Sequence, residues 1–489
     1  MVSFGKKVVK YRIPILIVSI LLLIPSALGY INTKVNYDIQ YYLPGDIDTM
    51  VGQDILLEDF GKGAFSMFMA EGMENKDVSA LKAKIEQVKG VDSVIWYDSI
   101  LDIGVPMELL PEKLLDVFQN GDVTLMAIFF EDTTSAEETM EAIEEIRKIG
   151  DKQCFLAGMS AVVTDTKNLS DSETPIYVMI AVLLSVLVLS VTMDSFLAPL
   201  MFLLSIGMAI VYNLGTNYFF GEVSYITKAL SAVLQLGVTM DYSIFLWHSY
   251  KENQERFPDD KNRAMAHAIS NTLTSVVGSS ITTIAGFIAL CFMSFTLGKD
   301  LGIVMAKGVV FGVIGCITIL PSMILVFAKA LSKTMHRPLI PDIGKCAGVI
   351  TKHSWVFIAL FLAVLFPALY GYTHTDVYYN LDRTLPDELA SITANKKLEE
   401  NFNMNSIHMV LADSSLDGKT AADMLAELNR VDGISFALGF DSLVGGAVPG
   451  DFFPEELTGK LKGERYQLML IASEYKVASD EVNAQIELL

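Results

Sequence analysis

One acidic residue, Asp241, lies near the middle of an apolar stretch, residues 229–250, that is long enough to cross a bilayer as a helix. An ionisable group at the bilayer centre costs roughly 2.5 kcal/mol or more unless it is paired, hydrated or neutral. Apolar surroundings penalise the charged form of a carboxyl, which suits a group that loads and unloads protons. The stretch therefore predicts a buried proton-handling site; an interhelical hydrogen bond without a transport role is the alternative.

Two neighbours of Asp241 are candidates to support it. Gly237 lies one turn earlier on the same helix face, where the absence of a side chain lets another helix approach closely. Tyr242 lies about 100° around the helix, so we expect its hydroxyl to serve a neighbouring helix or water. For Tyr242, simple packing is the alternative.

Small and polar residues at helical spacing mark the next apolar stretch, among them Ser279 and Thr282. Such a face is either a packing seam or the lining of a relay. The stretch after it contains one basic residue, Lys307, beside Gly308 and Gly312, which have the spacing of closely packed membrane helices. Lys307 either pairs with an acidic group or extends its amine to the nearby membrane surface.

Other kinds of chemistry have no support in the sequence. It contains no Gly-rich nucleotide-binding loop, no metal-ligand spacing and no basic stripe for nucleic acid, and its six histidines are dispersed. We therefore expect no metal, no cofactor, no nucleic-acid partner and no enzymatic activity.

Composition explains which elements position these residues. The chain is 52% hydrophobic although it has 57 acidic residues and a net charge of −21, so apolar and acidic residues must be segregated along it. We predict seven membrane spans. They lie at residues 13–31, 176–192, 196–220, 229–250, 269–297, 301–328 and 355–372.

Two long acidic regions separate the spans, and basic residues gather at one end of them. Lys6, Lys7 and Lys10 precede the first span, and further Lys and Arg residues follow the fourth and sixth spans. The positive-inside rule then predicts a cytoplasmic N-terminus and two extracytoplasmic domains in the cell membrane. A cleaved signal peptide is the alternative for the first block.

The first acidic region alternates between strand and helix patterns. Strand-like segments at 64–72, 91–98 and 123–132 are separated by helical segments at 79–90 and 135–150. This order predicts small α+β units of the split βαβ type.

The chain also repeats itself at an offset of 342 residues. The matches begin with Pro25, Gly29 and Tyr30 against Pro367, Gly371 and Tyr372, and with one insertion they continue into 105–114 against 448–457. An internal duplication is the simplest explanation. The second copy stops at Leu489, so we expect a truncated chain, or a second half supplied by another subunit.

The order of spans and domains resembles the resistance-nodulation-division (RND) superfamily. The segments GVTMDYSIFL (237–246), TMDSFLAPL (192–200), SITTIAGFIAL (280–290) and ILPSMILV (319–326) are similar to its MMPL branch, which carries an Asp-Tyr pair in the fourth span. The resemblance implies a proton relay at Asp241 and Tyr242. It also implies a relay partner on a tenth span, beyond Leu489.

The predicted fold is a polytopic α-helical membrane protein with two extracytoplasmic α+β porter-like domains, the second incomplete. The predicted parts are an N-terminal segment with the first span (1–31), the first domain (32–174), spans two to six (175–330), a basic linker (331–354), the seventh span (355–372) and the second domain (373–489).

The resemblance implies a transporter driven by the proton-motive force that exports a lipid or another hydrophobic or amphiphilic molecule. The expected partners are that molecule, protons, the bilayer and the missing half, with a homo-oligomer left open. A SecDF-like accessory of protein export and a sterol-sensing-like lipid sensor or receptor without transport share the architecture and are the alternatives.

Overall fold

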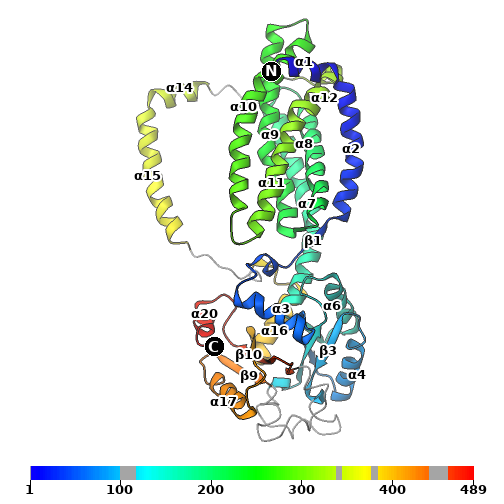
Figure 1. Ribbon diagram of the computed structural model, residues 1–489. Helices are drawn as coiled ribbons and strands as arrows, with labels where there is room; N and C mark the ends of the chain where they lie inside the picture. The colour runs from blue at the N-terminus through cyan, green and yellow to red at the C-terminus, as the bar shows by residue number, and fades with distance from the viewer. Residues whose placement is uncertain (1, 100–116, 337–343, 376–383, 440–460) are drawn as a thin grey trace. The chain divides into compact units, whose positions relative to one another are not determined.

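The computed structural model describes residues 2–99, 117–336, 344–375, 384–439 and 461–489. Two compact units divide the chain (Figure 1). We call Met1–Leu43 with Ser170–Asp376 the helical unit, and Pro44–Leu169 with Val377–Leu489 the α+β unit. The repeated segments 105–114 and 448–457 lie outside the described residues.

The helical unit is built from helices of different lengths, several of them long and apolar. They are α1 (Val2–Lys10), α2 (Arg12–Asn32), α7 (Met159–Thr192), α8 (Leu197–Gly215), α9 (Tyr225–Arg256), α10 (Lys261–Leu290), α11 (Leu297–Ile314), α12 (Leu320–Val326), α13 (Ala328–Lys333), α14 (Gly344–Lys352) and α15 (Ser354–Thr373). A π-helical turn, η5 (Gly315–Ile319), joins α11 to α12, and α7 crosses the division between the units.

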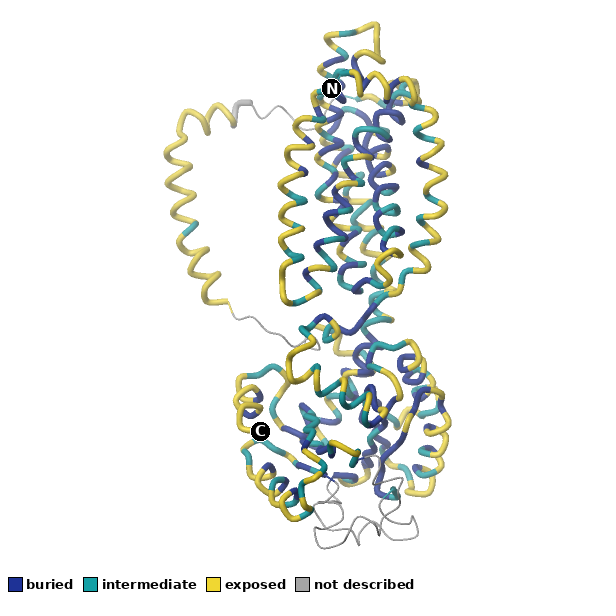
Figure 2. The backbone as a smooth tube through the Cα atoms, in the orientation of Figure 1, coloured by how far each residue is buried: buried dark blue, intermediate teal, exposed yellow. Residues whose placement is uncertain are grey.

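Within the described residues, seven helical segments are long and apolar enough to cross a membrane, which confirms the seven predicted spans. They are Arg12–Asn32, Met159–Thr192, Leu197–Phe220, Tyr225–Arg256, Lys261–Leu290, Leu297–Val326 and Ser354–Thr373. Segments 197–220 and 297–326 are more than half buried, whereas α2, α7 and α10 are mostly exposed (Figure 2). Large apolar side chains make up much of the exposed surface of α2 and α7. An apolar exterior of this kind suits contact with lipid.

Local signals in the sequence start two of these helices. The side chain of Ser224 accepts a hydrogen bond from the amide of Ile226 at the start of α9, and Asp260 does the same for Arg263 at the start of α10. Both are ordinary N-caps that satisfy otherwise unpaired amides.

The two ends of the helical unit differ. At one end, which we call the strand end, β1 (Lys34–Asn36) pairs in parallel with β7 (Glu222–Ser224). A short turn, η4 (Thr216–Phe220), leads from α8 to β7. At the other end, which we call the α1 end, α1 packs along α10: a Cβ at Gly5 would lie 2.3 Å from the carbonyl oxygen of Ala266. Only a glycine allows that approach.

The α+β unit contains two sheets whose neighbouring strands are antiparallel. The first sheet has the order β3-β5-β2-β6, with β4 against β5, and the second has the order β8-β10-β9. The strands are β2 (Ala64–Glu71), β3 (Val91–Ile95), β4 (Gln119–Asn120), β5 (Val123–Phe130), β6 (Cys154–Ala157), β8 (Ser406–Asp413), β9 (Ile434–Gly439) and β10 (Tyr466–Ser473). Since β5 lies between β2 and β3, the predicted split βαβ arrangement is confirmed.

The helices of this unit repeat with the strands. They are α3 (Asp48–Phe60), α4 (Asn75–Ile85) and α6 (Glu137–Ile149) in the first copy, and α16 (Ala390–Phe402), α17 (Gly418–Leu428) and α20 (Asp480–Ile486) in the second. Helix α16 follows α3, and β8 follows β2, at an offset of 342 residues; β10 follows β5 at 343. The internal duplication is therefore visible in the secondary structure.

The first helix of each copy contacts the other copy. Helix α16 of the second copy lies on the first sheet, where Leu398 and Phe402 pack with Met69 of β2. Helix α3 of the first copy lies against both sheets: Phe60 packs in one cluster with Leu468 of β10 and Phe129 of β5. Arg465 also forms an ion pair of 2.6 Å with Asp59 at the end of α3. The two predicted soluble regions thus fold into one compact unit.

Candidate functional site

Helix α9 turns Asp241 away from the centre of the helical unit. Gln235, Thr239 and Tyr242 are buried on its inner face, whereas Asp241 and Gly237 are exposed. The expected burial of Asp241 is thus wrong for the described part of the chain, because α8 and α11 pack against the opposite side of α9. Among the described residues nothing lies within 4 Å of a Cβ placed at Gly237, so this face is open to a further partner.

Tyr242 has the opposite environment from its neighbour. Its side chain is 3% exposed and belongs to the main apolar core of the helical unit. Its backbone carbonyl accepts a hydrogen bond of 3.2 Å from the thiol of Cys316 in the π-helical turn. Short π-helical turns occur often at functional sites, and this one holds the turn of α9 that carries Asp241.

The predicted polar face of α10 is also open. Ser279 and Thr282 are exposed, and the Thr282 hydroxyl donates a hydrogen bond of 2.7 Å to the Ser279 carbonyl. Helices α9 and α10 pack directly against each other, and the exposed residues of both belong to the outer surface of the helical unit. No contact between Asp241 and these hydroxyls is seen among the described residues.

Lys307 lies apart from Asp241, inside the helical unit. Its amine donates a hydrogen bond of 2.5 Å to the side-chain oxygen of Asn217 and lies 5.0 Å from the centre of the Phe220 ring. The neighbouring glycines form the predicted close-packing face: a Cβ at Gly308 would lie 2.7 Å from the Asn213 amide nitrogen, and one at Gly312 would lie 2.3 Å from Thr239.

The sequence reasoning missed a buried pair of amide side chains, Asn213 of α8 and Gln235 of α9. Both are fully buried. The Asn213 amide donates 2.9 Å to the Gln235 side-chain oxygen, and the Gln235 amide donates 3.0 Å to the Gly308 carbonyl. The signal was present, since each is a strongly polar residue within an apolar span.

A second missed cluster ties the α1 end together. Asp194, in the loop between α7 and α8, forms an ion pair of 2.9 Å with Lys251 and accepts a hydrogen bond of 2.9 Å from the Trp247 indole. Burial alone would raise the pKa of the Asp194 carboxyl, but the bonds from Lys251 and Trp247 outweigh burial and hold its pKa below the usual range. This cluster fixes the segment TMDSFLAPL to the end of α9.

At the strand end, Tyr37 joins the segment after β1 to the spans. Its hydroxyl donates a hydrogen bond of 3.1 Å to Asp171, and its ring stacks on Tyr225 at 5.5 Å. Burial, and then the negative charge of Asp171, raise the pKa of Tyr37 well above its usual value, so the hydroxyl stays a donor. Lys228 lies 3.4 Å from the same carboxylate.

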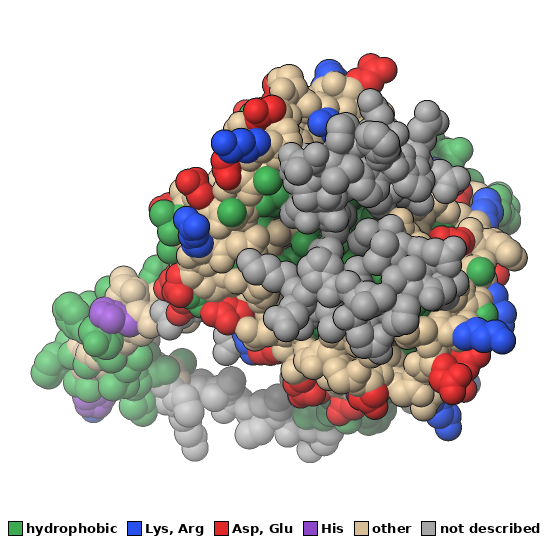
Figure 3. Space-filling view, turned by 90° about the horizontal axis from the view of Figure 1, so that it is seen from below, with side chains coloured by type: hydrophobic (Ala, Val, Ile, Leu, Met, Phe, Trp, Pro, Cys, Tyr) green, Lys and Arg blue, Asp and Glu red, His purple; other side chains and the backbone are tan. Residues whose placement is uncertain are grey.

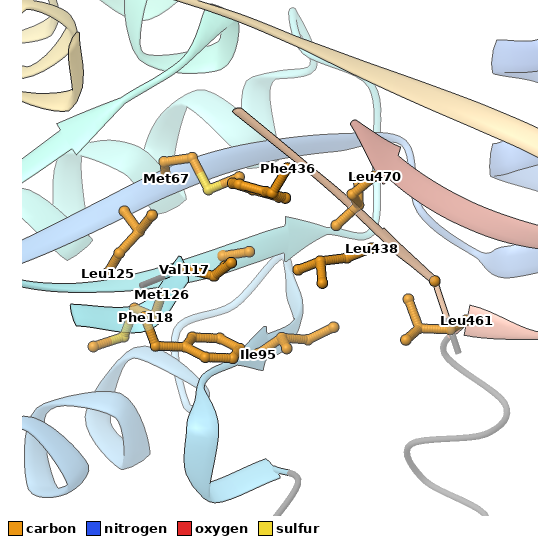
Figure 4. A pocket seen from close by; sticks show the side chains of 12 residues that line it. Met67, Ile95, Val117, Phe118, Leu125, Met126, Phe436, Leu438, Leu461 and Leu470 are labelled. Atoms are coloured by element: carbon orange, nitrogen blue, oxygen red, sulfur yellow. The ribbon is translucent and has the colours of Figure 1, made fainter. Parts of the chain in front are cut away.

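The α+β unit contains an apolar cavity between its two sheets (Figure 4). It encloses about 580 Å³ including its mouth, and every side chain that lines it is apolar. The lining residues are Met67, Ile95, Val117, Phe118, Leu125, Met126, Ala127, Phe436, Leu438, Gly439, Leu461 and Leu470. Figure 3 shows acidic and basic side chains around the surface of this unit.

Metal chemistry has no support in the part of the chain that the structure describes. No group of three or more His, Cys, Asp or Glu side chains there could hold a metal ion.

Comparison with known proteins identifies the helical part of the chain. Residues 115–351, which include α7 to α13, match the MMPL family. Over these residues the chain belongs to the MMPL family. The match includes Asp241, Tyr242 and Lys307, as well as the Asn213–Gln235 pair.

The relatives of this MMPL chain include membrane proteins and an exporter. ActII-3 of Streptomyces coelicolor is 26% identical over 41% of this chain and 29% of its own length. A membrane protein of Methanocaldococcus jannaschii is 26% identical over 49% of this chain and 63% of its own length. The apo-petrobactin exporter of Bacillus anthracis is 24% identical over 55% of this chain and 38% of its own length. The chain thus spans less than two thirds of each of these relatives.

Proposed function

We propose that this MMPL chain is part of a transporter, and not of an enzyme, that exports a lipid or another hydrophobic or amphiphilic molecule across the cytoplasmic membrane. The proton-motive force drives the export, and Asp241 carries the proton. The position of Asp241 is the main support: a carboxyl in an apolar span, on a helix face that no described residue covers.

Energetics give that position its meaning. A carboxylate in contact with hydrocarbon costs roughly 2.5 kcal/mol or more, so Asp241 needs water, a polar partner or a proton. Gly237 leaves room for another helix on the same face, and Ser279 and Thr282 of α10 add polar groups to the adjacent surface. A helix from the rest of the protein that covers this face completes the relay. Tyr242, held in the core, keeps the Asp241 turn in place.

The apolar cavity of the α+β unit supports the choice of cargo. Its lining offers no hydrogen-bond partner from a side chain, so it suits an alkyl chain or a similar apolar group. One of the relatives is an exporter, which agrees with a transport role for this chain. The cargo in that relative's name is not transferred to this chain. The exposed Lys6, Lys7 and Lys10 at the α1 end favour a cytoplasmic location for that end and an extracytoplasmic α+β unit.

Transport in vesicles tests this proposal. The full protein is reconstituted with a fluorescent phospholipid, a pH gradient is applied, and lipid movement is measured together with internal pH. We expect Asp241→Asn to insert normally and to lower gradient-driven lipid movement by roughly 100-fold, the scale of a lost proton-transfer group. The matched control is Asp259→Asn, in the exposed turn between α9 and α10, which should transport normally.

Two results would contradict the proposal. Full gradient-driven transport by Asp241→Asn would remove the role of this carboxyl. Lipid binding by the unaltered protein without any lipid or proton movement would instead favour a sensor.

A further inference from the structure

The buried amide pair has one polar atom without a partner. Asn213 and Gln235 are 0% exposed. Their hydrogen bonds use the side-chain nitrogen of Asn213 and both the side-chain nitrogen and the side-chain oxygen of Gln235. The side-chain oxygen of Asn213 is buried and accepts no hydrogen bond from the residues that the structure describes. An unpaired buried acceptor is destabilising, so this atom points to a polar ligand.

A cavity lies at the strand end, and Asn217 of the η4 turn is one of its lining residues. It encloses about 490 Å³ including its mouth and is lined by polar as well as apolar residues, among them Thr33, Lys228 and Asn217. Liquid water occupies about 30 Å³ per molecule, so several waters fit. Asn217 is itself 2% exposed and lies four residues beyond Asn213 in the chain.

Lys307 connects the cavity wall to the buried pair. Its amine donates to the side chain of Asn217, which lines the cavity. The carbonyl of the next residue, Gly308, accepts from Gln235. The polar groups of Asn217, Lys307, Gly308, Gln235 and Asn213 therefore form a row from the cavity wall to the buried pair, in which hydrogen bonds join all but Lys307 and Gly308, neighbours in the chain.

We propose that this row, which we call the polar inlet, binds water molecules that enter from the strand end and reach the side-chain oxygen of Asn213. Water supplies the missing donor to Asn213 and solvates the ammonium group of Lys307, each of which is costly to hold in a dry apolar interior. The inlet thus gives Lys307 proton exchange with the solution at the strand end. It does not depend on Asp241, whose side chain leaves the opposite face of α9.

Single cysteines test the inlet with silver ion, a small thiol reagent carried by water. The four native cysteines are replaced by serine in the full protein. Asn213→Cys and Gln235→Cys then place thiols on α8 and α9. The matched controls are Ala209→Cys, 1% exposed and one turn away on α8, and Leu236→Cys, 7% exposed and next to Gln235. The thiols left unreacted are counted by maleimide labelling after denaturation.

We expect both inlet thiols to react at least tenfold faster than the controls, and only when silver is added at the strand end of oriented vesicles. Rates equal to the controls would overturn the proposal, as would fast reaction from the α1 end. Fast reaction in detergent with slow reaction in lipid vesicles would also overturn it, because a lipid would then occupy the cavity. Two thiols on different helices keep the test decisive if one variant folds poorly, and none of these outcomes depends on transport.

Discussion

The two copies of the repeat are packed differently in the two units. In the α+β unit each copy contacts the other, because α16 packs on the first sheet and α3 reaches the second. In the helical unit the corresponding helices α2 and α15 differ: Gly29 of α2 lies against the backbone of Gly215, whereas nothing described lies within 4 Å of Gly371 in α15. The same sequence pattern is therefore covered by another helix in α2 and left exposed in α15.

The contrast shows that a helix face suited to close packing is not always covered by another helix. Both helices present a proline, a glycine and a tyrosine at equal spacing, so both carry a face suited to close packing. Only α2 has a partner helix in the described part of the chain, and the Tyr212 hydroxyl of α8 also donates 2.6 Å to the Ser19 carbonyl of α2. No residue of α15 is buried.

The packing of each first helix on the other copy of the α+β unit can be disrupted by a substitution in α3 or in α16. These substitutions have the largest expected effect on stability. Phe60→Ala and Phe402→Ala each remove a buried ring and should cost about 3–5 kcal/mol of stability. We expect hydrogen exchange to rise in β8 and β10 of the second copy for Phe60→Ala, and in β2 and β6 of the first copy for Phe402→Ala. Mass spectrometry of the purified protein measures both.

Each of these variants is the control for the other. Faster hydrogen exchange only in the copy that carries the substitution would contradict the packing of α3 and α16 on the other copy.

The contrast between α2 and α15 can be sharpened by adding bulk to equivalent glycines. A Cβ at Gly29 would lie 2.3 Å from the Gly215 carbonyl oxygen, so Gly29→Leu forces the helices apart and should cost about 1–3 kcal/mol. Gly371→Leu should cost almost nothing in the chain of 489 residues. Thermal denaturation of that chain in detergent measures both; an equal loss would show that Gly371 is packed as closely as Gly29 and would remove the contrast.

A smaller difference between the two sheets concerns pH. Burial lowers the pKa of His408 in β8, whereas the equivalent position in β2 is Ser66. As pH falls below about 6.5, the unfolded chain binds the proton before the folded chain does. As pH falls further, the free energy of unfolding therefore decreases, and the decrease ends once His408 is protonated in the folded chain as well.

The loss should be small and confined to the second sheet. We expect His408→Gln to flatten the decline in denaturation temperature between about pH 7 and pH 5. An unchanged decline in this variant would assign the pH dependence to another group.

The sequence by itself determined the elements and their repetition. Hydropathy over about 20 residues marks a span, alternation marks a strand, and aligned Gly, Pro and Tyr residues mark the duplication. These signals are local or compare the chain with itself. That is why the seven spans, the split βαβ units and the 342-residue offset could be predicted, together with the close packing at Gly308 and Gly312. The role of Asp241 stays a prediction.

Only the tertiary structure decided which faces are covered. Asp241 and Tyr242 are adjacent in the sequence, yet one is exposed and the other lies in the core. Asn213 and Gln235 are 22 residues apart and meet because α8 and α9 pack side by side, and α3 and α16 each pack on the sheet of the other copy. Periodicity gives the direction of a side chain relative to its own helix, whereas burial depends on the neighbour that arrives from elsewhere in the chain.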